Sequence, residues 1–126
     1  MSKIFPAFAL LSVTLLCTGT AFAQRATISN DTAFYNGKRY AVGDSVNLAY
    51  GSDQGKKFAF VKMGGALIGM RHLESRFYKA TVKIDKVFTQ LGKCYLRGKM
   101  VDQSLPPGYK VFIELEGAID NKEIKE

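Results

Sequence analysis

The residues in this sequence best suited to chemistry are basic and aromatic side chains in its second half. Alternate residues of a β-strand share a face. One face is therefore expected to present Lys79, Lys83, Tyr95, Arg97, Lys99 and Phe112. Such a face can bind a polyanion, because cations contact phosphates or carboxylates and rings stack on bases or sugars. The alternative is a solvated strand face with cross-strand charge pairs to Asp85 and Glu114.

Nucleophilic catalysis would depend on Cys94 and His72. Cys94 would be the nucleophile and His72 its base, but Cys94 falls on the inward phase of its segment and no third residue orients His72. Free cysteine is among the residue types most often buried. We expect a buried Cys94, with an intermolecular link or a reactive thiol as the alternatives. We therefore expect no catalytic residues, and a small envelope enzyme using Cys94 or His72 is the least supported function.

Other site chemistries lack the residues they need. Zinc sites take several Cys or His ligands, and only His72 and Cys94 follow residue 23. Glu114 and Glu116 would be neighbours on one strand, whereas a glycosidase pair faces across a cleft. We expect neither a metal nor a cofactor.

Strands in the second half must position the basic and aromatic residues. Arg76–Phe88 alternates apolar and polar residues, as a half-buried strand does. Thr89–Lys93 would turn the chain into a partner strand, Cys94–Val101, and Tyr109–Leu115 would be the last strand. The side chains expected to point inward are Tyr78, Ala80, Val82, Ile84, Cys94, Leu96, Met100, Tyr109, Val111, Ile113 and Leu115.

The first half predicts shorter strands. Asn36-Gly37 between Thr32–Tyr35 and Lys38–Val42 is a strong hairpin signal. Downstream, a Gly43-Asp44 turn would lead to a half-buried strand, and Lys57–Met63 would form another with Phe58 and Phe60 on one face. Gln24–Asp31 is expected to be irregular, a brief apolar turn is expected around residues 66–70, and Ala118–Ile124 could form one helical turn.

Five or six short strands with close turns favour a mainly β fold. A small closed barrel would remove exposed sheet edges. One segment resembles the Y-x-V-G-D-x-V-x-L opening of many SH3-like small barrels. It is Tyr40-Ala41-Val42-Gly43-Asp44-Ser45-Val46-Asn47-Leu48. The resemblance covers nine residues and implies an SH3-like barrel. It also implies a module that binds peptides, cell-wall polymers or nucleic acid, or one with a structural role. The long hairpin keeps an OB-like barrel as an alternative.

The N-terminus has the pattern of an export signal. Lys3 precedes the apolar run Ile4–Leu16, and Ala21-Phe22-Ala23 matches the A-x-A cleavage pattern. The run is too short for an ordinary membrane span. We predict a cleaved signal peptide, 1–23, a single domain, 24–126, and a periplasmic or secreted location. A lipoprotein signal at Cys17 is the alternative.

Charge suggests the class of partner. The formal net charge is +7, and cleavage of the signal peptide would remove one positive charge with Lys3. Basic surfaces attract anionic partners. After export, we expect an anionic glycan, peptidoglycan or a lipid headgroup, with nucleic acid a poor natural target. A structural or protein–protein interaction module of the cell envelope, using an apolar patch at Leu67, Ile68 and Met70, is the alternative. Composition does not fix the oligomeric state.

Overall fold

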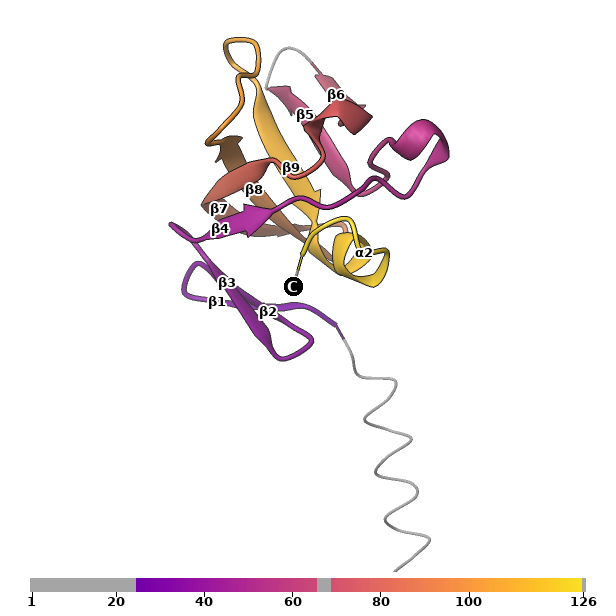
Figure 1. Ribbon diagram of the computed structural model, residues 1–126. Helices are drawn as coiled ribbons and strands as arrows, with labels where there is room; N and C mark the ends of the chain where they lie inside the picture. The colour runs from indigo at the N-terminus through magenta and orange to yellow at the C-terminus, as the bar shows by residue number, and fades with distance from the viewer. Residues whose placement is uncertain (1–24, 66–68, 126) are drawn as a thin grey trace, which may run out of the picture.

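A computed structural model describes residues 25–65 and 69–125, and these residues form a mainly β architecture (Figure 1). The predicted β class is therefore confirmed. The strands are β1 (Thr27–Ser29), β2 (Thr32–Tyr35), β3 (Lys38–Ala41), β4 (Ser45–Asn47), β5 (Val61–Gly65), β6 (Gly69–His72), β7 (Thr81–Gln90), β8 (Lys93–Met100) and β9 (Lys110–Glu114). The helical segments are the 3₁₀ turns η1 (Gln54–Lys56) and η2 (Ser75–Phe77) and the helix α2 (Leu115–Asp120).

The described strands pair in two antiparallel sheets. One sheet has the order β1-β2-β3, and the other has the order β4-β7-β8-β9-β5-β6. Figure 1 shows the small sheet beside one end of the large sheet, close to strand β4. Neither ladder returns to its first strand, so the predicted closed barrel, SH3-like or OB-like, is not confirmed.

Several local predictions are confirmed. Asn36 and Gly37 take the positive φ values of 55° and 78° that a two-residue hairpin requires. The Gly43-Asp44 turn leads into β4, where Val46 is buried and its neighbours are exposed. Strands β7 and β8 form the long hairpin, and β9 pairs with β8 on the opposite side from β7.

Other predicted elements were placed wrongly. Thr27–Ser29 forms β1 instead of an irregular segment, because β2 supplies a partner strand. Of the predicted strand Lys57–Met63, only the part from Val61 onward pairs in the sheet. Phe58 and Phe60 precede this part and do not share a face. Phe58 is fully buried, and Phe60 is partly exposed.

Strand β7 differs from its prediction in two ways. It begins at Thr81, because η2 and the turn after it occupy the first residues of the predicted strand, and Tyr78 is exposed. A β-bulge lies between Ile84 and Lys86 and shifts the alternation by one residue. Ile84 and Val87 are consequently both buried, although they are three residues apart and a regular strand would place them on opposite faces.

The core lies on the inner face of the large sheet. Of the side chains predicted to point inward, those fully or nearly fully buried are Ala80, Val82, Ile84, Cys94, Leu96, Val111, Ile113 and Leu115. Met100 and Tyr109 are partly buried against them. The period-two pattern therefore identified the core face of β8 and β9 correctly.

The C-terminal segment is part of the core. Helix α2 begins at Leu115, earlier than the predicted turn, and Leu115, Ala118 and Ile119 are buried. Ile124 then forms a β-bridge with Leu48. The segment Ala118–Ile124, predicted as one helical turn, ends with two further buried residues, Glu123 and Ile124.

A tyrosine connects the small sheet to α2. The hydroxyl of Tyr35 donates to Asp120, with Oδ1 and Oδ2 at 2.8 and 3.0 Å. This hydrogen bond, burial and the charges of Asp120 and Glu116 raise the pKa of Tyr35 to about 12. The Tyr35 hydroxyl therefore keeps its proton, and with it the hydrogen bond, through the physiological pH range.

The predicted signal peptide, Cys17 and the apolar pair Leu67 and Ile68 lie outside the described residues. Among the residues that are described, no helix combines the length and apolar character needed to cross a membrane.

Candidate ligand-binding face

The structure brings together five of the six predicted site residues. Lys83 lies opposite Lys99 in the β7–β8 ladder, and Arg97 lies opposite Phe112 in the β8–β9 ladder. Tyr95 shares their face, two residues before Arg97.

Lys79 is the site residue that the structure separates from the others. It precedes β7 with a φ of 63°, and its Nζ lies 5.7 Å from the centroid of the Tyr78 ring. The sequence predicted a strand from Arg76 whose outward side chains included Lys79. Because β7 begins only at Thr81, Lys79 does not belong to the paired strand.

The outward face of the large sheet also gathers residues that were not in the predicted set. These neighbours come from β5 and the residue before it, from β6, β7, β8 and β9, and from the turn between β7 and β8. We call the whole set the basic aromatic face, and it comprises Phe60, Lys62, Met70, Lys83, Asp85, Lys86, Phe88, Gln90, Leu91, Lys93, Tyr95, Arg97, Lys99, Lys110, Phe112 and Glu114.

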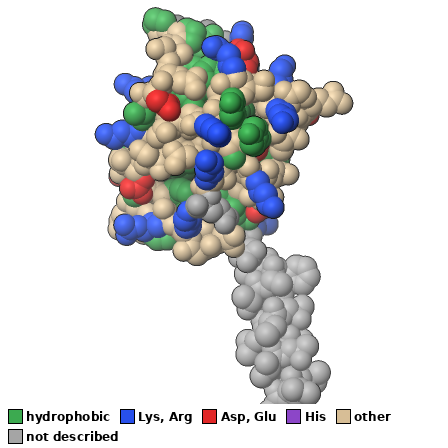
Figure 2. All heavy atoms as spheres, in the orientation of Figure 1, with side chains coloured by type: hydrophobic (Ala, Val, Ile, Leu, Met, Phe, Trp, Pro, Cys, Tyr) green, Lys and Arg blue, Asp and Glu red, His purple; other side chains and the backbone are tan. Residues whose placement is uncertain are grey.

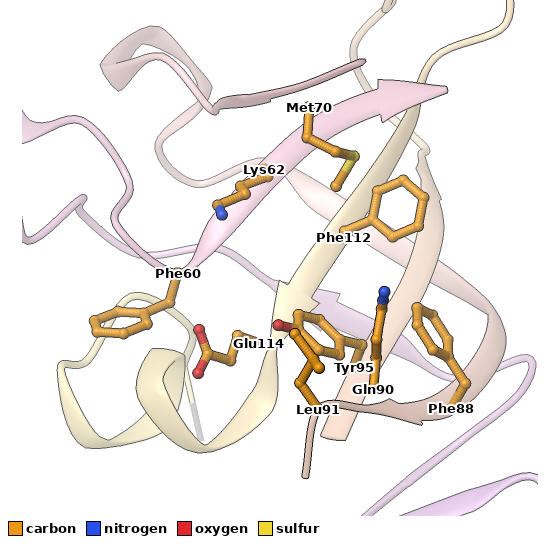
Figure 3. A pocket seen from close by; sticks show the side chains of 9 residues that line it. All are labelled: Phe60, Lys62, Met70, Phe88, Gln90, Leu91, Tyr95, Phe112 and Glu114. Atoms are coloured by element: carbon orange, nitrogen blue, oxygen red, sulfur yellow. The ribbon is translucent and has the colours of Figure 1, made fainter. Parts of the chain in front are cut away.

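Aromatic rings line a hollow of about 270 Å³ on this face. Phe88 stacks on Tyr95 with centroids 5.5 Å apart, and Phe112 meets Phe88 edge-on at 6.4 Å. Figure 3 shows Glu114 between Phe60 and Tyr95, in keeping with the Tyr95–Glu114 register and the hydrogen bond from the Glu114 amide to the Phe60 carbonyl. We call this hollow the ring hollow.

Some cations of the face pair with carboxylates, as the alternative interpretation predicted. Asp85 accepts from Arg97 Nε and from Lys110 Nζ, both at 2.7 Å. Lys93 Nζ lies 2.9 Å from Glu114 Oε1. The two carboxylates therefore balance part of the positive charge on the face.

A surplus of positive charge nevertheless remains. Within residues 25–65 and 69–125, no ion pair joins Lys62, Lys83, Lys86 or Lys99 to an acidic side chain. The Nζ of Lys86 lies instead 5.5 Å from the centroid of the Phe88 ring, within cation–π range. All four side chains are exposed, so they are accessible to a dissolved anion.

Asp85 is expected to make stability depend on acid pH. Burial opposes its ionisation, but hydrogen bonds from Lys110 and Arg97 and their charges outweigh burial, so the pKa of Asp85 lies below its ordinary value. The stabilisation is complete above the unfolded-state pKa of about 3.9 and is lost as pH falls through the lower folded pKa. Partial exposure limits it to about 1 kcal/mol or less.

Thermal unfolding of the wild type and Asp85→Asn between pH 7 and pH 2.5 measures this contribution. The wild type should have the higher midpoint above pH 5, and the difference should shrink below pH 4. A difference that stays constant down to pH 2.5 would contradict an ionised Asp85 as its source.

Cys94 and His72 do not form a catalytic pair. Cys94 is buried, as predicted, and burial together with the charge of Glu116 raises the pKa of its thiol to about 11. His72 lies on the exposed strand β6, three strands from β8 in the sheet order, and its Nδ1 hydrogen-bonds to the Phe58 carbonyl at 3.0 Å. A protonated, covered thiol is a poor nucleophile.

The glutamates of the last strand were also expected to share a face. Glu114 ends β9, whereas Glu116 lies in the first turn of α2, so the two do not alternate along one strand. In the part of the chain that the structure describes, no three His, Cys, Asp or Glu side chains cluster as metal ligands would.

Sequence reasoning missed the ring hollow because two of its residues depend on long-range structure. The bulge at Asp85 turns Phe88 outward, and the pairing of β5 with β9 places Lys62 opposite Phe112. Glu114, which also lines the hollow, could have been found, since it alternates with Phe112 on one strand.

Comparisons with protein-family models, curated proteins and solved structures found no match for this chain. The basic aromatic face itself therefore has to support any functional interpretation.

Proposed function

We propose that this protein is a non-catalytic, exported binding module that contacts an anionic component of the cell envelope through its basic aromatic face. One observation supports this most strongly. Partly exposed rings line a hollow, and four lysines without acidic partners among the described residues lie on the same face. Cations bind the anionic groups of a polymer, and rings offer surfaces on which its units stack.

The wider surface has a compatible charge. Lysine and arginine side chains outnumber acidic ones on the face seen in Figure 2, and they surround exposed hydrophobic side chains. A positive surface potential raises the rate at which anionic partners arrive. The export signal expected at residues 1–23 would place this surface among envelope polymers.

A polymer-retention experiment tests the proposal. The purified protein is passed over immobilised peptidoglycan, acidic glycan, anionic lipid vesicles and DNA while salt is raised. We expect selective, salt-sensitive retention on one envelope polymer. Lys62→Glu/Lys86→Glu should weaken it by at least about 10-fold, because two cations of the face become anions.

Lys38→Glu/Lys125→Glu is the matched control, since it makes the same charge change at exposed positions outside the face. Equal losses in both double variants, or equal retention on every polyanion, would show that only net charge matters. No retention at low salt would also overturn the proposal. Cell fractionation and N-terminal sequencing check export, with Gln24 as the expected first residue.

A further inference from the structure

A second hollow lies on the same face as the ring hollow. Its volume is about 350 Å³, and the residues that line it are Val42, Gly43, Lys83, Ile84, Asp85, Lys99 and Lys110. We call it the lysine hollow. Tyr95 and Lys99 are four residues apart on β8, so about 13 Å of one extended strand separates the two hollows.

The lysine hollow is built around a like-charge pair. Lys83 and Lys99 are direct cross-strand partners, and neither has an acidic partner among the described residues. Like charges in this position oppose folding. An anion between them would remove that repulsion, so the pair is suited to a carboxylate or another small anionic group.

The ring hollow has a different charge balance. Its lining contains one cation, Lys62, and one carboxylate, Glu114. Lys93 pairs with Glu114 from outside this lining, and the ring hollow lacks the lysine pair of the lysine hollow. Glu114 can accept a hydrogen bond from a hydroxyl, while Lys62 and Gln90 offer donors. Beside the stacked Phe88–Tyr95 rings, these groups suit a neutral, hydroxyl-bearing ring.

The residues between the hollows continue the polar surface. Arg97 lies between Tyr95 and Lys99 on β8 and pairs with Asp85 of the lysine hollow, so the middle of the face is polar and its charge is largely balanced. A chain running along β8 would therefore meet a cationic site, a balanced polar segment and an aromatic site in succession.

We infer that the ligand is an acidic polysaccharide in which carboxylated and neutral sugars alternate, bound along β8 with a carboxylate in the lysine hollow and a neutral sugar in the ring hollow. This inference rests on the proposed function and names its ligand class. A single-stranded nucleic acid or a phospholipid surface would place phosphates in the ring hollow, which lacks the lysine pair, as well as in the lysine hollow, and both are therefore a poorer match.

Calorimetric titration with hyaluronan oligosaccharides, which alternate glucuronate with a neutral sugar, tests the inference on the purified protein. Polygalacturonate, in which every ring is charged, dextran, anionic vesicles and single-stranded DNA are the comparison probes. We expect the hyaluronan octasaccharide to bind more tightly than each of these. It should also bind far more tightly than the disaccharide, which cannot occupy both hollows at once.

Two variants test the two hollows separately. Lys83→Gln/Lys99→Gln and Tyr95→Thr should each weaken octasaccharide binding by about 10-fold or more. The lysine variant should unfold at the same or a higher temperature than the wild type, because it removes a repulsion. Lys38→Gln/Lys125→Gln, away from the face, should bind normally.

The possible outcomes distinguish failure of the inference from failure of the proposed function. Equal binding of polygalacturonate, or sensitivity to only one of the two variants, would overturn the alternating ligand and its two hollows. Binding of vesicles or peptidoglycan but not hyaluronan, with loss in Lys62→Glu/Lys86→Glu, would overturn the inference and leave the proposed function standing. Absence of binding to every probe and to peptidoglycan would overturn both.

Discussion

Replacing Glu123 with alanine is expected to lower the free energy of unfolding by about 3–5 kcal/mol. Its carboxylate is fully buried, and four donors converge on it. Oε2 accepts from the Ser52 amide at 2.9 Å, the Ser52 hydroxyl at 2.6 Å and the Ala59 amide at 2.7 Å, and Oε1 accepts from the Phe60 amide at 2.8 Å. Alanine would leave these donors without an acceptor.

The effect should be large because Glu123 joins distant parts of the chain. Residues 52–60 contain η1 but no strand, and the Glu123 side chain supplies the acceptor for three of their backbone amides, those of Ser52, Ala59 and Phe60. The Glu123 carbonyl also accepts from the Ala49 amide at 2.7 Å. We therefore expect hydrogen-exchange protection at Ala59 and Phe60 to fall together with global stability.

Glu123→Gln provides a graded comparison. The glutamine oxygen can replace Oε2, but its NH₂ group would face the Phe60 amide, so one donor loses its acceptor at a cost of about 1–3 kcal/mol. Urea unfolding followed by circular dichroism measures all variants, with the partly exposed Glu116→Ala as the control. A Glu123→Ala midpoint equal to that of the control would contradict this role for the carboxylate.

Gly98→Ala is expected to destabilise the protein by about 3 kcal/mol. Gly98 pairs with Ile84 at the edge of the bulge, where β7 and β8 approach closely. A Cβ at this position would collide with the Lys83 carbonyl oxygen and lie 2.6 Å from Val82 Cγ1. The carbonyl cannot move away unless the β7–β8 ladder shifts, so the cost exceeds that of a contact with a flexible side chain.

The same unfolding measurement tests this prediction. Lys99→Ala, one residue further on and exposed, is the control and should change stability by no more than about 0.5 kcal/mol. Because the Gly98 contact involves Lys83, Gly98→Ala should also perturb the lysine hollow. A Gly98→Ala protein as stable as the control would show that the two strands separate more easily than their geometry implies.

The sequence by itself determined the local structure and much of the core. Alternating apolar residues identified the buried faces of β8 and β9, because a strand places every second side chain on one face. Asn36-Gly37 specified its hairpin, because both residues tolerate positive φ. The apolar phase of Cys94 also placed it correctly in the core. Each of these signals acts over a few neighbouring residues.

Only the tertiary structure decided the make-up of the site. A strict alternation continued from Ile84 would bury Phe88, but the bulge turns it outward beside Tyr95. The pairing of β5 with β9 brings Lys62 to Phe112 from about fifty residues away in the chain. Strand pairing between distant segments leaves no local periodic signal, so these neighbours could not be predicted from spacing.

The burial of Glu123 likewise depended on the tertiary structure. A glutamate in a charged tail is ordinarily solvated, since burying an unpaired carboxylate is costly. Here backbone amides of a distant loop and one hydroxyl replace its water. The sequence determined which residues prefer the interior, and the fold supplied the hydrogen-bond donors that allow a charged residue to join them.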